Sequence, residues 1–282
     1  MTTGTNRTPD VAVLGLGIIG GIWARHLASD GRLAAAWNRT PRPDFPGWVA
    51  TPAAAAERAD TLIVVVADPP AVETVLRDLG AKIGAQHLII QSSTIDPAAS
   101  RRFGDWAAAR GAAYVEAPFT GSKPAAEARR VVYYLGGAPA AIARAQPVLE
   151  RLSEKRFVIG DGPQAATLKL ACNIQIAAQL EVLCEALAWC RKAGIADDVF
   201  FSALRSNAAW SGLVQLKEPK LRAGDYAPHF SAKHMLKDLR LALAAASESR
   251  LPVAQTVAAR LQAVRALGLG DEDMSALYCL LK

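Results

Sequence analysis

The chain has 282 residues, of which 51% are hydrophobic and 21% are charged. This is ordinary globular usage, which excludes a disordered or fibrous chain, and the length is about twice that of a common single domain, so two domains are expected. The net charge is +6, but the Lys and Arg residues are scattered and form no stripe with interleaved aromatics. The charge therefore favours a small anionic ligand over nucleic acid.

Cysteine usage and hydropathy predict a cytoplasmic protein without metal or membrane. The four cysteines form no CxxC pair and have no neighbouring histidines at metal-ligand spacing, so we expect reduced packing residues. Residues 1–10 are polar and lack the hydrophobic core of a signal peptide, which places the first structured residues at about Val11. The apolar stretch 165–190 is interrupted by Lys169, Glu181 and other polar residues, which argues against a membrane span.

Up to residue 159, short apolar runs of strand length alternate with helical segments. Such alternation predicts crossover connections and a doubly wound, mostly parallel sheet, an α/β Rossmann arrangement. The run Leu62–Val66 is apolar throughout, as in a central strand covered on both faces. The strands are predicted at 11–14, 33–37, 62–66, 88–91, 113–116, 131–135 and 156–159, and the helices at 18–29, 52–59, 71–79, 97–110 and 138–152.

The second part of the chain is predicted to be all-α, because no strand-like run follows Gly162-Pro163. We therefore expect a Rossmann domain at 1–163 and a helical domain at 164–282, joined by one long helix over 165–193. Helix breaks are predicted at Gly194, Gly212, Gly224, Pro252 and Gly268. The long alanine-rich helices carry more apolar surface than so small a bundle needs, which favours a homodimer or higher homo-oligomer.

A glycine motif opens the first domain. Gly15, Gly17 and Gly20 form GxGxxG between a predicted strand and a predicted helix, which is the context that distinguishes a dinucleotide site from a tight turn. In such a turn the first glycine permits the bend, the second admits a pyrophosphate and the third lets the helix pack on the strand. Within this motif the residues predicted to bind the cofactor are Gly15, Leu16, Gly17, Ile18, Ile19 and Gly20.

The end of the second strand indicates which dinucleotide binds. NAD enzymes usually place an acidic residue there, whereas this chain has Asn38-Arg39-Thr40, followed by Arg42. A guanidinium suits a 2′-phosphate through charge-assisted hydrogen bonds, so NADP is predicted; the alternative is that Arg39 is a solvated loop residue. The turn Ala67-Asp68 after the third strand is predicted to pass over the nicotinamide ribose, and Asp68 and Asp96 are predicted helix caps before prolines.

Three later segments have compositions that suit a substrate site. Gln91–Pro97 ends the fourth strand, where ligands bind in open α/β sheets, although it also suits a plain helix cap. Glu116–Lys123 contains Thr120-Gly121-Ser122, which offers hydroxyl and N–H groups to a carboxylate. Lys169 and Asn173 lie one turn apart on an apolar helix, where an isolated lysine usually reaches outward to water.

Together these segments, with Asn38-Arg39-Thr40 and the stretch from Phe230 to Leu243, resemble the β-hydroxyacid dehydrogenase family over nearly the whole chain. The glyoxylate and succinic semialdehyde reductase branch is most similar. The resemblance implies that Lys169 is the proton donor or acceptor and that Asn173 orients it. It also implies that the pocket, shared by substrate and nicotinamide, is lined by Thr94, Thr120, Gly121 and Ser122 and closed by Phe230, Lys237 and Asp238, with Thr94 and Lys237 also touching cofactor.

The chain departs from the family pattern at two places. The family usually has Pro-Val-Ser-Gly where this chain has Pro118-Phe119-Thr120-Gly121, and a glycine-rich turn where it has Pro163-Gln164-Ala165. Because Phe119 is bulkier than valine, substrate identity does not transfer from any one relative. Gln91, which precedes the Ser-Ser-Thr stretch, has no interpretation from the sequence.

The predicted activity is reduction of a small anionic aldehyde or keto acid by NADPH, or the reverse oxidation of the hydroxy acid, with Lys169 as acid or base. Two alternatives stay open. Imine reductases share the architecture but generally place Asp or Tyr at the position of Lys169. A non-catalytic NADP-binding sensor or scaffold would use the fold for recognition alone, and the pair of Lys169 and Asn173 argues against it.

Overall fold

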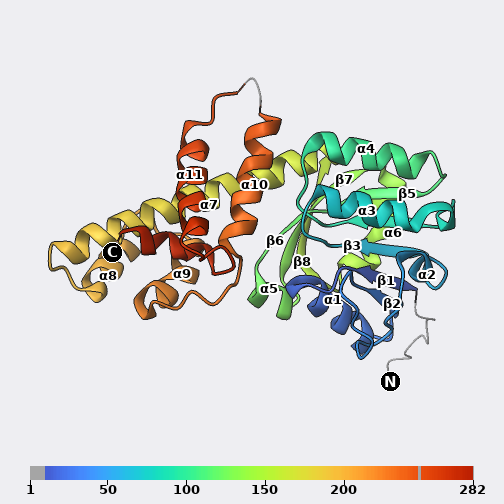
Figure 1. Ribbon diagram of the computed structural model, residues 1–282, viewed down its shortest axis with the longest axis horizontal. Coiled ribbons are helices and arrows are strands. Elements are labelled where there is room, and N and C mark those ends of the chain that lie inside the picture. The colour runs from blue at the N-terminus through green and yellow to red at the C-terminus, as the bar shows by residue number, and fades with distance from the viewer. Residues whose placement is uncertain (1–9, 247–248, 282) are drawn as a thin grey trace. The chain divides into compact units, whose positions relative to one another are not determined.

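The computed structural model describes residues 10–246 and 249–281 (Figure 1). The chain divides into two compact units, one ending at Lys169 and the other beginning at Leu170. This division falls within the helix α7 (Gly162–Lys192). A domain boundary at 163/164, earlier in the same helix, stays a prediction.

The first unit contains an eight-stranded sheet. Its order is β2-β1-β3-β4-β5-β7-β6, with β8 paired to β7. Pairing is parallel from β2 through β5 and between β7 and β8, whereas β5 and β6 run antiparallel to β7. The sheet is therefore mostly parallel, as predicted. The strands are β1 (Val11–Leu14), β2 (Leu33–Trp37), β3 (Thr61–Val64), β4 (Leu88–Gln91), β5 (Ala113–Glu116), β6 (Phe119–Thr120), β7 (Val131–Gly137) and β8 (Ser153–Gly160).

Helices cover both faces of this sheet. Successive strand residues point to opposite sides, so each face presents apolar side chains that a helical layer buries. Ile63 packs in one core layer with side chains of α1 and α6, and Leu62 packs in the other with side chains of α2, α3 and α4. Both residues are fully buried, so the prediction of a central strand is confirmed. The helices are α1 (Ile18–Ser29), α2 (Pro52–Ala56), α3 (Pro69–Leu79), α4 (Pro97–Ala108), α5 (Lys123–Glu127) and α6 (Pro139–Leu149), with a 3-10 turn η1 (Gly80–Lys82) after α3.

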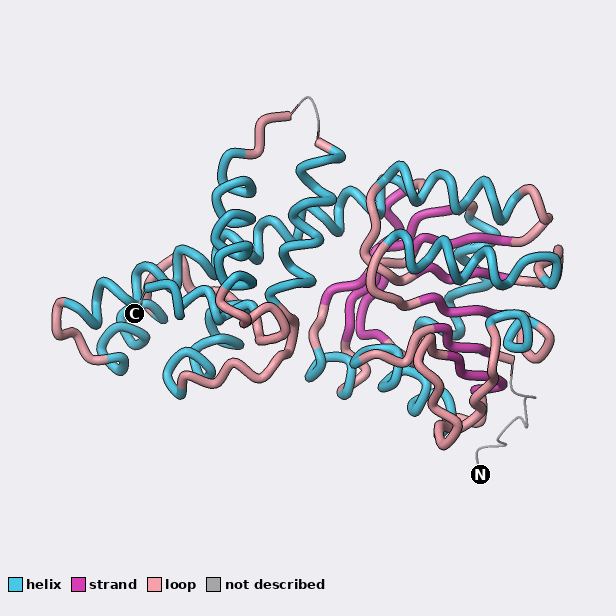
Figure 2. Tube along the Cα trace, viewed as in Figure 1, coloured by secondary structure: helices cyan, strands magenta, loops and turns pink. Residues whose placement is uncertain are grey.

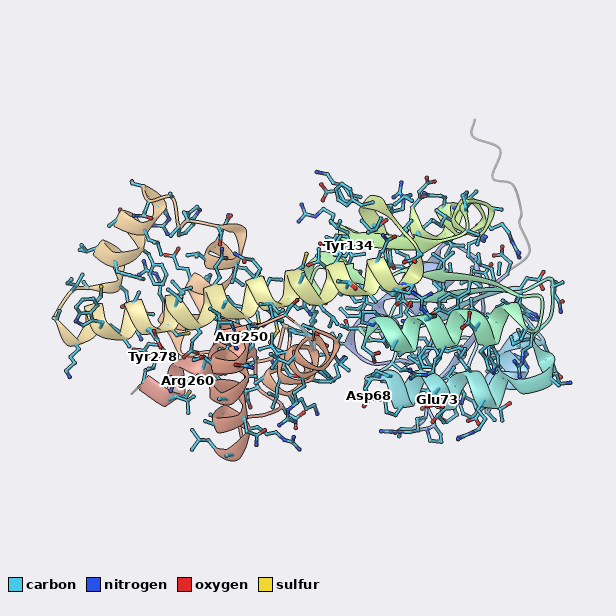
Figure 3. All side chains as sticks on the ribbon, turned by 90° about the horizontal axis from the view of Figure 1, so that it is seen from above. Asp68, Glu73, Tyr134, Arg250, Arg260 and Tyr278 are labelled. Atoms are coloured by element: carbon cyan, nitrogen blue, oxygen red, sulfur yellow. The ribbon has the colours of Figure 1, made fainter. Side chains whose placement is uncertain are left out.

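Local chemistry explains where two of these helices begin. The carboxylate of Asp68 accepts a hydrogen bond from Ala71 N at 2.9 Å, and that of Asp96 accepts one from Ala99 N at 2.8 Å. Each is followed by proline in the first turn, where a missing N–H costs nothing. Both predicted caps are confirmed, and Figure 3 shows Asp68 at the beginning of α3.

Several predicted bounds were wrong. β3 ends at Val64 instead of Val66, β7 and β8 are longer than predicted, and α2, α4 and α6 end earlier. β6 and α5 were not predicted at all, because a two-residue strand and a five-residue helix are too short to show a hydrophobic period.

In the part that the structure describes, the second unit is helical (Figure 2), which confirms the predicted all-α part. A core that includes Leu180, Phe201, Leu236 and Leu261 joins its helices. Gly212 was predicted as a break, but it is the first residue of α9, whose N-cap is Ser211. After α7 the unit contains α8 (Asp197–Arg205), α9 (Gly212–Ala223), α10 (Ala232–Ala245), α11 (Pro252–Ala266) and the 3-10 helix η2 (Met274–Leu281).

A buried ion pair lies in the second unit. The ammonium of Lys217 on α9 lies 2.6 Å from the carboxylate of Asp273, and both side chains are almost completely buried. The same carboxylate accepts hydrogen bonds from the backbone N–H groups of His229, Phe230 and Ser275 and from the Ser275 hydroxyl. Asp273 thereby connects α9, the segment before α10 and η2.

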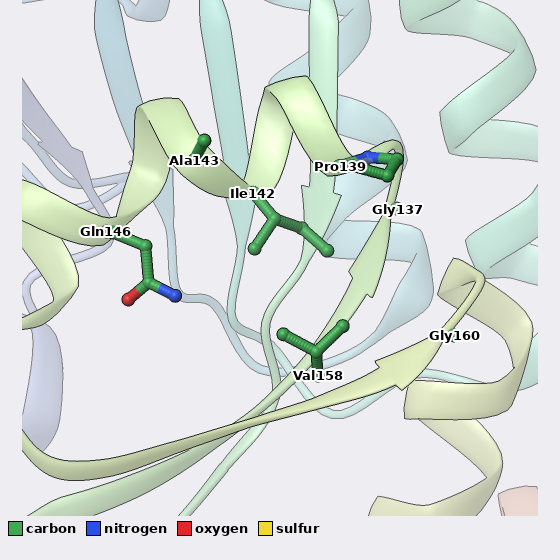
Figure 4. Close-up of a pocket in the computed structure, with 7 residues that line it drawn as sticks. All are labelled: Gly137, Pro139, Ile142, Ala143, Gln146, Val158 and Gly160. Carbon is green, nitrogen blue, oxygen red and sulfur yellow. The ribbon is translucent and has the colours of Figure 1, made fainter.

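Two apolar surfaces are also present. A groove between α6 and the end of β8 receives the side chains of Ile142 and Val158 (Figure 4). On α7, Val182 and Trp189 are exposed large hydrophobic residues. By length and composition alone, α7 could cross a membrane, and 44% of the apolar stretch concerned is buried inside the protein.

Candidate functional site

The glycine turn between β1 and α1 is closely packed at two of its three glycines. Gly15 has φ +114°, which disfavours other residues, and a Cβ there would overlap the carbonyl oxygen of Val65. A Cβ at Gly20 would overlap the carbonyl oxygen of Gly15. The first and third glycines of the motif are therefore required by backbone contact within the turn.

The second glycine faces open space. No atom lies within 4 Å of a Cβ built at Gly17, which is exposed. Gly17 is the N-cap of α1, no side chain caps this end, and the first turn has no acidic residue. The first N–H groups of a helix lack intrahelical partners and carry partial positive charge, so this end fits the pyrophosphate of a dinucleotide.

The segment after β2 is tied to the glycine turn. The side-chain oxygen of Asn38 accepts a hydrogen bond from Leu16 N at 2.9 Å, and its amide nitrogen donates to Thr40 O at 2.9 Å. The guanidinium of Arg42 donates to Leu16 O at 3.0 Å. Arg39 and Thr40 are exposed beside these anchored residues. The turn thus holds two arginines next to the helix end that fits the pyrophosphate.

The loops after β3 and β4 are connected by one hydrogen bond. Val66 N donates to the hydroxyl of Ser93 at 2.9 Å. Ala67 is exposed, while the carboxylate of Asp68 is engaged in capping α3. Thr94, the next residue after Ser93, is half-buried.

The segment after β5 contains Thr120, Gly121 and Ser122, all half-buried. Gly121 has φ +116°, and Ser122 is the N-cap of α5. The bulky side chain of Phe119 packs against other aromatic side chains. Its ring packs against the rings of Trp23 and Tyr133, with centroids 4.8 and 6.1 Å away. The residue that replaces the usual valine is thus part of an aromatic cluster.

Gln91 and Glu116 form a buried polar cluster at the ends of β4 and β5. The Gln91 amide donates to Glu116 Oε1 at 2.7 Å, and the Tyr114 hydroxyl donates to Glu116 Oε2 at 2.8 Å. Burial raises the pKa of Glu116 to about 7, although the neighbouring Ser100, Tyr114 and Gln91 oppose this shift. Gln91 had no interpretation from sequence alone, because its partner Glu116 lies 25 residues away along the chain.

The helix α7 carries two of the predicted site residues, Lys169 and Asn173. Lys169 and Asn173 are both buried and lie four residues apart on α7, so they share one face of the helix. The amide nitrogen of Asn173 donates to Asp238 Oδ2 at 2.6 Å. The ammonium of Lys237 lies 2.7 Å from Asp238 Oδ1. Asp238 on α10 thereby accepts a hydrogen bond from Asn173 and forms an ion pair with Lys237.

Phe230 precedes α10, and its ring stacks on that of His234. In the first unit, Leu16 of the glycine turn contacts Asn38, and Asn38 in turn contacts Thr40. In the second unit, Asn173, Lys237 and Asp238 come together through one carboxylate. Glu116, Gln91 and Ser93 belong to the first unit's polar cluster and were absent from the predicted site.

Comparison with known proteins identifies the family. Residues 10–160 match the family described as the NAD binding domain of 6-phosphogluconate dehydrogenase. Residues 163–281 match the family described as NAD-binding of NADP-dependent 3-hydroxyisobutyrate dehydrogenase. The chain belongs to the β-hydroxyacid dehydrogenase family. It is therefore an NAD(P)-dependent oxidoreductase that acts on CH–OH groups, as predicted.

Individual relatives agree over most of their length. Glyoxylate/succinic semialdehyde reductase 1 of Arabidopsis thaliana is 29% identical over 279 residues, covering 95% of this chain and 96% of the relative. The 3-hydroxyisobutyrate dehydrogenase of Pseudomonas aeruginosa is 30% identical over 252 residues, covering 83% and 84%. The crystal structure of 3-hydroxyisobutyrate dehydrogenase from Salmonella typhimurium aligns with TM-score 0.84 and 26% identity, covering 96% and 99%.

Proposed function

We propose that the protein is an NADPH-dependent reductase of a small anionic aldehyde or keto acid, with Lys169 as the proton donor. The observation that carries this proposal is the pairing of an arginine-bearing turn after β2 with a buried lysine on α7. The first feature selects a phosphorylated dinucleotide, and the second supplies a cation where a reduced carbonyl oxygen needs a proton.

The preference for NADP follows from charge. Where an acidic residue would bind a ribose 2′-hydroxyl, this chain has Asn38, Arg39 and Thr40. Asn38 is held by Leu16 and Thr40, so the backbone that bears Arg39 is anchored, and the guanidinium of Arg42 is held by Leu16. A 2′-phosphate would accept charge-assisted hydrogen bonds from Arg39, with Arg42 as the second cation.

The chemistry divides between cofactor and protein. The bound NADPH supplies a hydride for the carbonyl carbon. Lys169 gives a proton to the carbonyl oxygen, which becomes the hydroxyl, and the ammonium also stabilises the negative charge developing on that oxygen. In the oxidative direction, a neutral Lys169 removes the hydroxyl proton.

Asn173 serves as the orienting partner of Lys169. Because its amide nitrogen donates to Asp238, the amide oxygen is the atom that can accept from the Lys169 ammonium or from a substrate hydroxyl. Asp238 also holds Lys237, so the amide, the carboxylate and the second lysine are oriented together. The substrate carboxylate is assigned to Thr120, Gly121 and Ser122, and the remaining lining to Thr94, Phe230 and Lys237.

We also propose a homodimer or higher homo-oligomer and a cytoplasmic location. The exposed Val182 and Trp189 on α7 are the apolar residues available for association. Light scattering tests the assembly: a mass above that of the 29.8 kDa chain supports it, and a mass equal to that of the chain in dilute solution contradicts it.

A substrate screen tests the proposed reaction. Oxidation of NADPH is followed with glyoxylate, succinic semialdehyde, tartronate semialdehyde and a cyclic imine. Turnover of an aldehyde or keto acid supports the proposal, and turnover of the imine alone would assign the protein to imine reduction. NADPH binding without turnover of any substrate would favour a sensor.

Cofactor preference is tested by Arg39→Ser. We expect NADPH to be preferred by the wild type and the variant to lose about tenfold to a hundredfold in kcat/KM for NADPH, with little change for NADH. Arg58→Ser, which removes an arginine outside this turn, is the control. Equal use of NADH and NADPH by the wild type would overturn the assignment.

Lys169→Ala tests the acid. Turnover should fall by about 10²–10⁴-fold, as for the loss of a general acid, while the Kd for NADPH changes little. Lys192→Ala, near the end of the same helix, is the matched control and should leave turnover unchanged. Near-normal turnover of the Lys169 variant would contradict the proposed role.

A further inference from the structure

Glu116 is a buried ionisable residue that the proposed mechanism does not use. Its side chain is fully buried, yet both carboxyl oxygens have hydrogen-bond donors: Gln91 on Oε1 and Tyr114 on Oε2. Burying a carboxyl group is costly, so a fold that only needed packing here would be better served by an apolar side chain. Packing alone therefore does not account for a glutamate at this position.

The hydrogen bonds of Glu116 continue into the loops at the edge of the sheet. Gln91 uses its amide on both sides: its nitrogen donates to Glu116 and to Ser93 O at 2.9 Å, and its oxygen accepts from Ser93 N at 2.7 Å. Ser93 in turn accepts from Val66 N through its hydroxyl. Glu116 thus connects β5 with the loops after β4 and β3.

These loops reach both parts of the proposed site within the first unit. The β3 loop supplies Val65, whose carbonyl oxygen closes against Gly15 in the glycine turn. The β4 loop continues directly from Ser93 to Thr94. A hydrogen-bonded chain from Glu116 therefore ends beside the cofactor turn on one branch and beside the predicted substrate residue on the other.

The beginning of α7 lies beside Ser100 and the Cβ of Glu116. A Cβ at Gly162 would lie 2.8 Å from the Ser100 hydroxyl and 3.3 Å from the Cβ of Glu116, so a larger residue at this position would require these side chains to shift. Gly162 is the first residue of α7, about two helical turns before Lys169. Because this contact is made by the Cβ of Glu116, it does not depend on the carboxyl group.

We propose that Glu116 is a positioning residue for the proposed reaction, which sets the loop Ser92–Thr94 through Gln91. It touches neither substrate nor cofactor in this role, and it acts by fixing the groups that do. Small misplacements of reacting groups cost about 10²-fold in rate, which is the scale on which such a residue matters.

The donors around Glu116 are neutral, and this makes the arrangement sensitive to protonation. Gln91 on β4, Tyr114 on β5 and Ser100 on α4 surround the carboxyl, and the carboxylate of Asp96 before α4 is the charged neighbour, which raises the pKa further. With the pKa raised to about 7, the carboxyl gains or loses its proton near neutral pH. Ionisation strengthens the bonds from Gln91 and Tyr114, because a carboxylate is the better acceptor.

The test compares Glu116→Ala with Glu116→Gln. Glu116→Ala removes the acceptor for Gln91 and Tyr114 and should lower kcat about 10²-fold with a small change in NADPH affinity. Amide hydrogen exchange at 92–94 should become faster. Glu116→Gln has the same shape and keeps an acceptor oxygen, so it should restore most of kcat and abolish any break in the pH–kcat profile near pH 7.

His87→Ala is the matched control, because His87 is buried just before β4, at the opposite end of that strand from Gln91. It loses hydrogen bonds with Gly84 N and Ala56 O and should lower stability without lowering kcat of the folded enzyme. If both alanine variants lower kcat equally, or if Glu116→Ala keeps kcat within about twofold, the positioning role is wrong.

The inference rests on the proposed reaction, but the two fail in different ways. Absence of turnover by the wild-type protein on every substrate would contradict the proposed function. Hydrogen exchange at 92–94 is measured without substrate, and unchanged exchange in Glu116→Ala would contradict the positioning role whether or not a substrate is found.

Discussion

Two buried carboxyl groups, one in each unit, are held in opposite ways. Glu116 in the first unit is surrounded by the neutral donors of Gln91 and Tyr114, and its pKa is raised to about 7 by burial. Asp273 in the second unit meets burial of the same kind, but the nearby Lys217 ammonium and the donors of Ser275 hold its pKa below its ordinary value. Equal burial thus gives opposite directions of shift.

The difference shows how each unit uses its polar interior. Near neutral pH Asp273 is permanently charged, and its cation and backbone donors fix three segments of the helical unit. Glu116 can exchange a proton in the same range, so the strand ends that it connects are held by an adjustable set of hydrogen bonds. A buried ion pair fixes a fold, whereas a buried carboxyl among neutral donors leaves a choice between two protonation states.

The largest expected effect comes from breaking the ion pair. Lys217→Met leaves the carboxylate of Asp273 buried without its cation and should lower the free energy of unfolding by about 3–5 kcal/mol, measured by urea denaturation. Lys220→Met on the same helix removes a cation whose partner Asp225 is exposed, and should cost about 1 kcal/mol or less.

A double variant separates charge from packing. Adding Asp273→Asn to Lys217→Met removes the unpaired charge but keeps an acceptor for the backbone N–H groups of His229 and Phe230, so part of the lost stability should return. If Lys217→Met and Lys220→Met cost the same, the contrast between the two carboxyl groups does not hold.

The next effect is the pH dependence of stability due to Glu116. Its pKa is raised in the folded protein from 4.5 to about 7, so both states are protonated below pH 4.5 and the folded state alone keeps the proton up to about 7. Stability should therefore fall as the pH rises through this window, by about 3 kcal/mol in all. Urea denaturation at pH 5 and pH 8 measures this loss of stability. The wild type should show it, and Glu116→Gln should not.

Ser275→Ala tests the hydrogen bonds that support Asp273. The hydroxyl donates to Asp273 Oδ1 at 2.8 Å in a fully buried position, so its loss should cost about 2 kcal/mol. Because the backbone N–H of Ser275 still donates to the same atom, the loss should be smaller than for Lys217→Met. Thermal or urea unfolding ranks the two, and the reverse order would show that Lys217 is not the main partner.

The smallest effect is expected at a helix cap in the first unit. Asp68→Ala removes the acceptor for Ala71 N and should cost about 1 kcal/mol in unfolding free energy. Asp68→Asn keeps an acceptor oxygen and should cost only a few tenths of a kcal/mol in unfolding free energy. A cost for the alanine variant well above that of Ser275→Ala would assign Asp68 a role beyond capping.

The sequence was most informative where structure depends on neighbours in the chain. Gly15, Gly17 and Gly20 act within one turn, so a local pattern predicted them. Asp68 and Asp96 each accept a hydrogen bond from the N–H group three residues ahead, so they too were predicted locally. The bounds of β3, β7 and β8 were less accurate, because strand ends are set by pairing with other strands. β6 exists through its pairing with β7, which no pattern within Phe119-Thr120 reveals.

The candidate site shows the same limit more strongly. The residues assigned to cofactor and substrate carry patterns that resemble a family, whereas Gln91 and Glu116 carry no local pattern for their contact. They meet because β4 and β5 are parallel neighbours whose carboxyl ends share one edge of the sheet. Likewise, Asn173 and Asp238 are 65 residues apart in the chain. The hydrogen bond from the Asn173 amide to the Asp238 carboxylate forms only in the folded structure, so no local pattern predicts it.

The unbroken path of α7 affects how this protein can be recombined with its relatives. The helix begins at Gly162 and continues through Lys192, so exchanging the helical unit at Leu170 would join halves of two different helices. A crossover at Asp161 instead transfers the whole helix, and a donor with glycine at its first position fits without a shift of Ser100 or Glu116, whereas a donor with a side chain there requires one. The first residue of the transferred helix is therefore a position to match between two parents of a chimera.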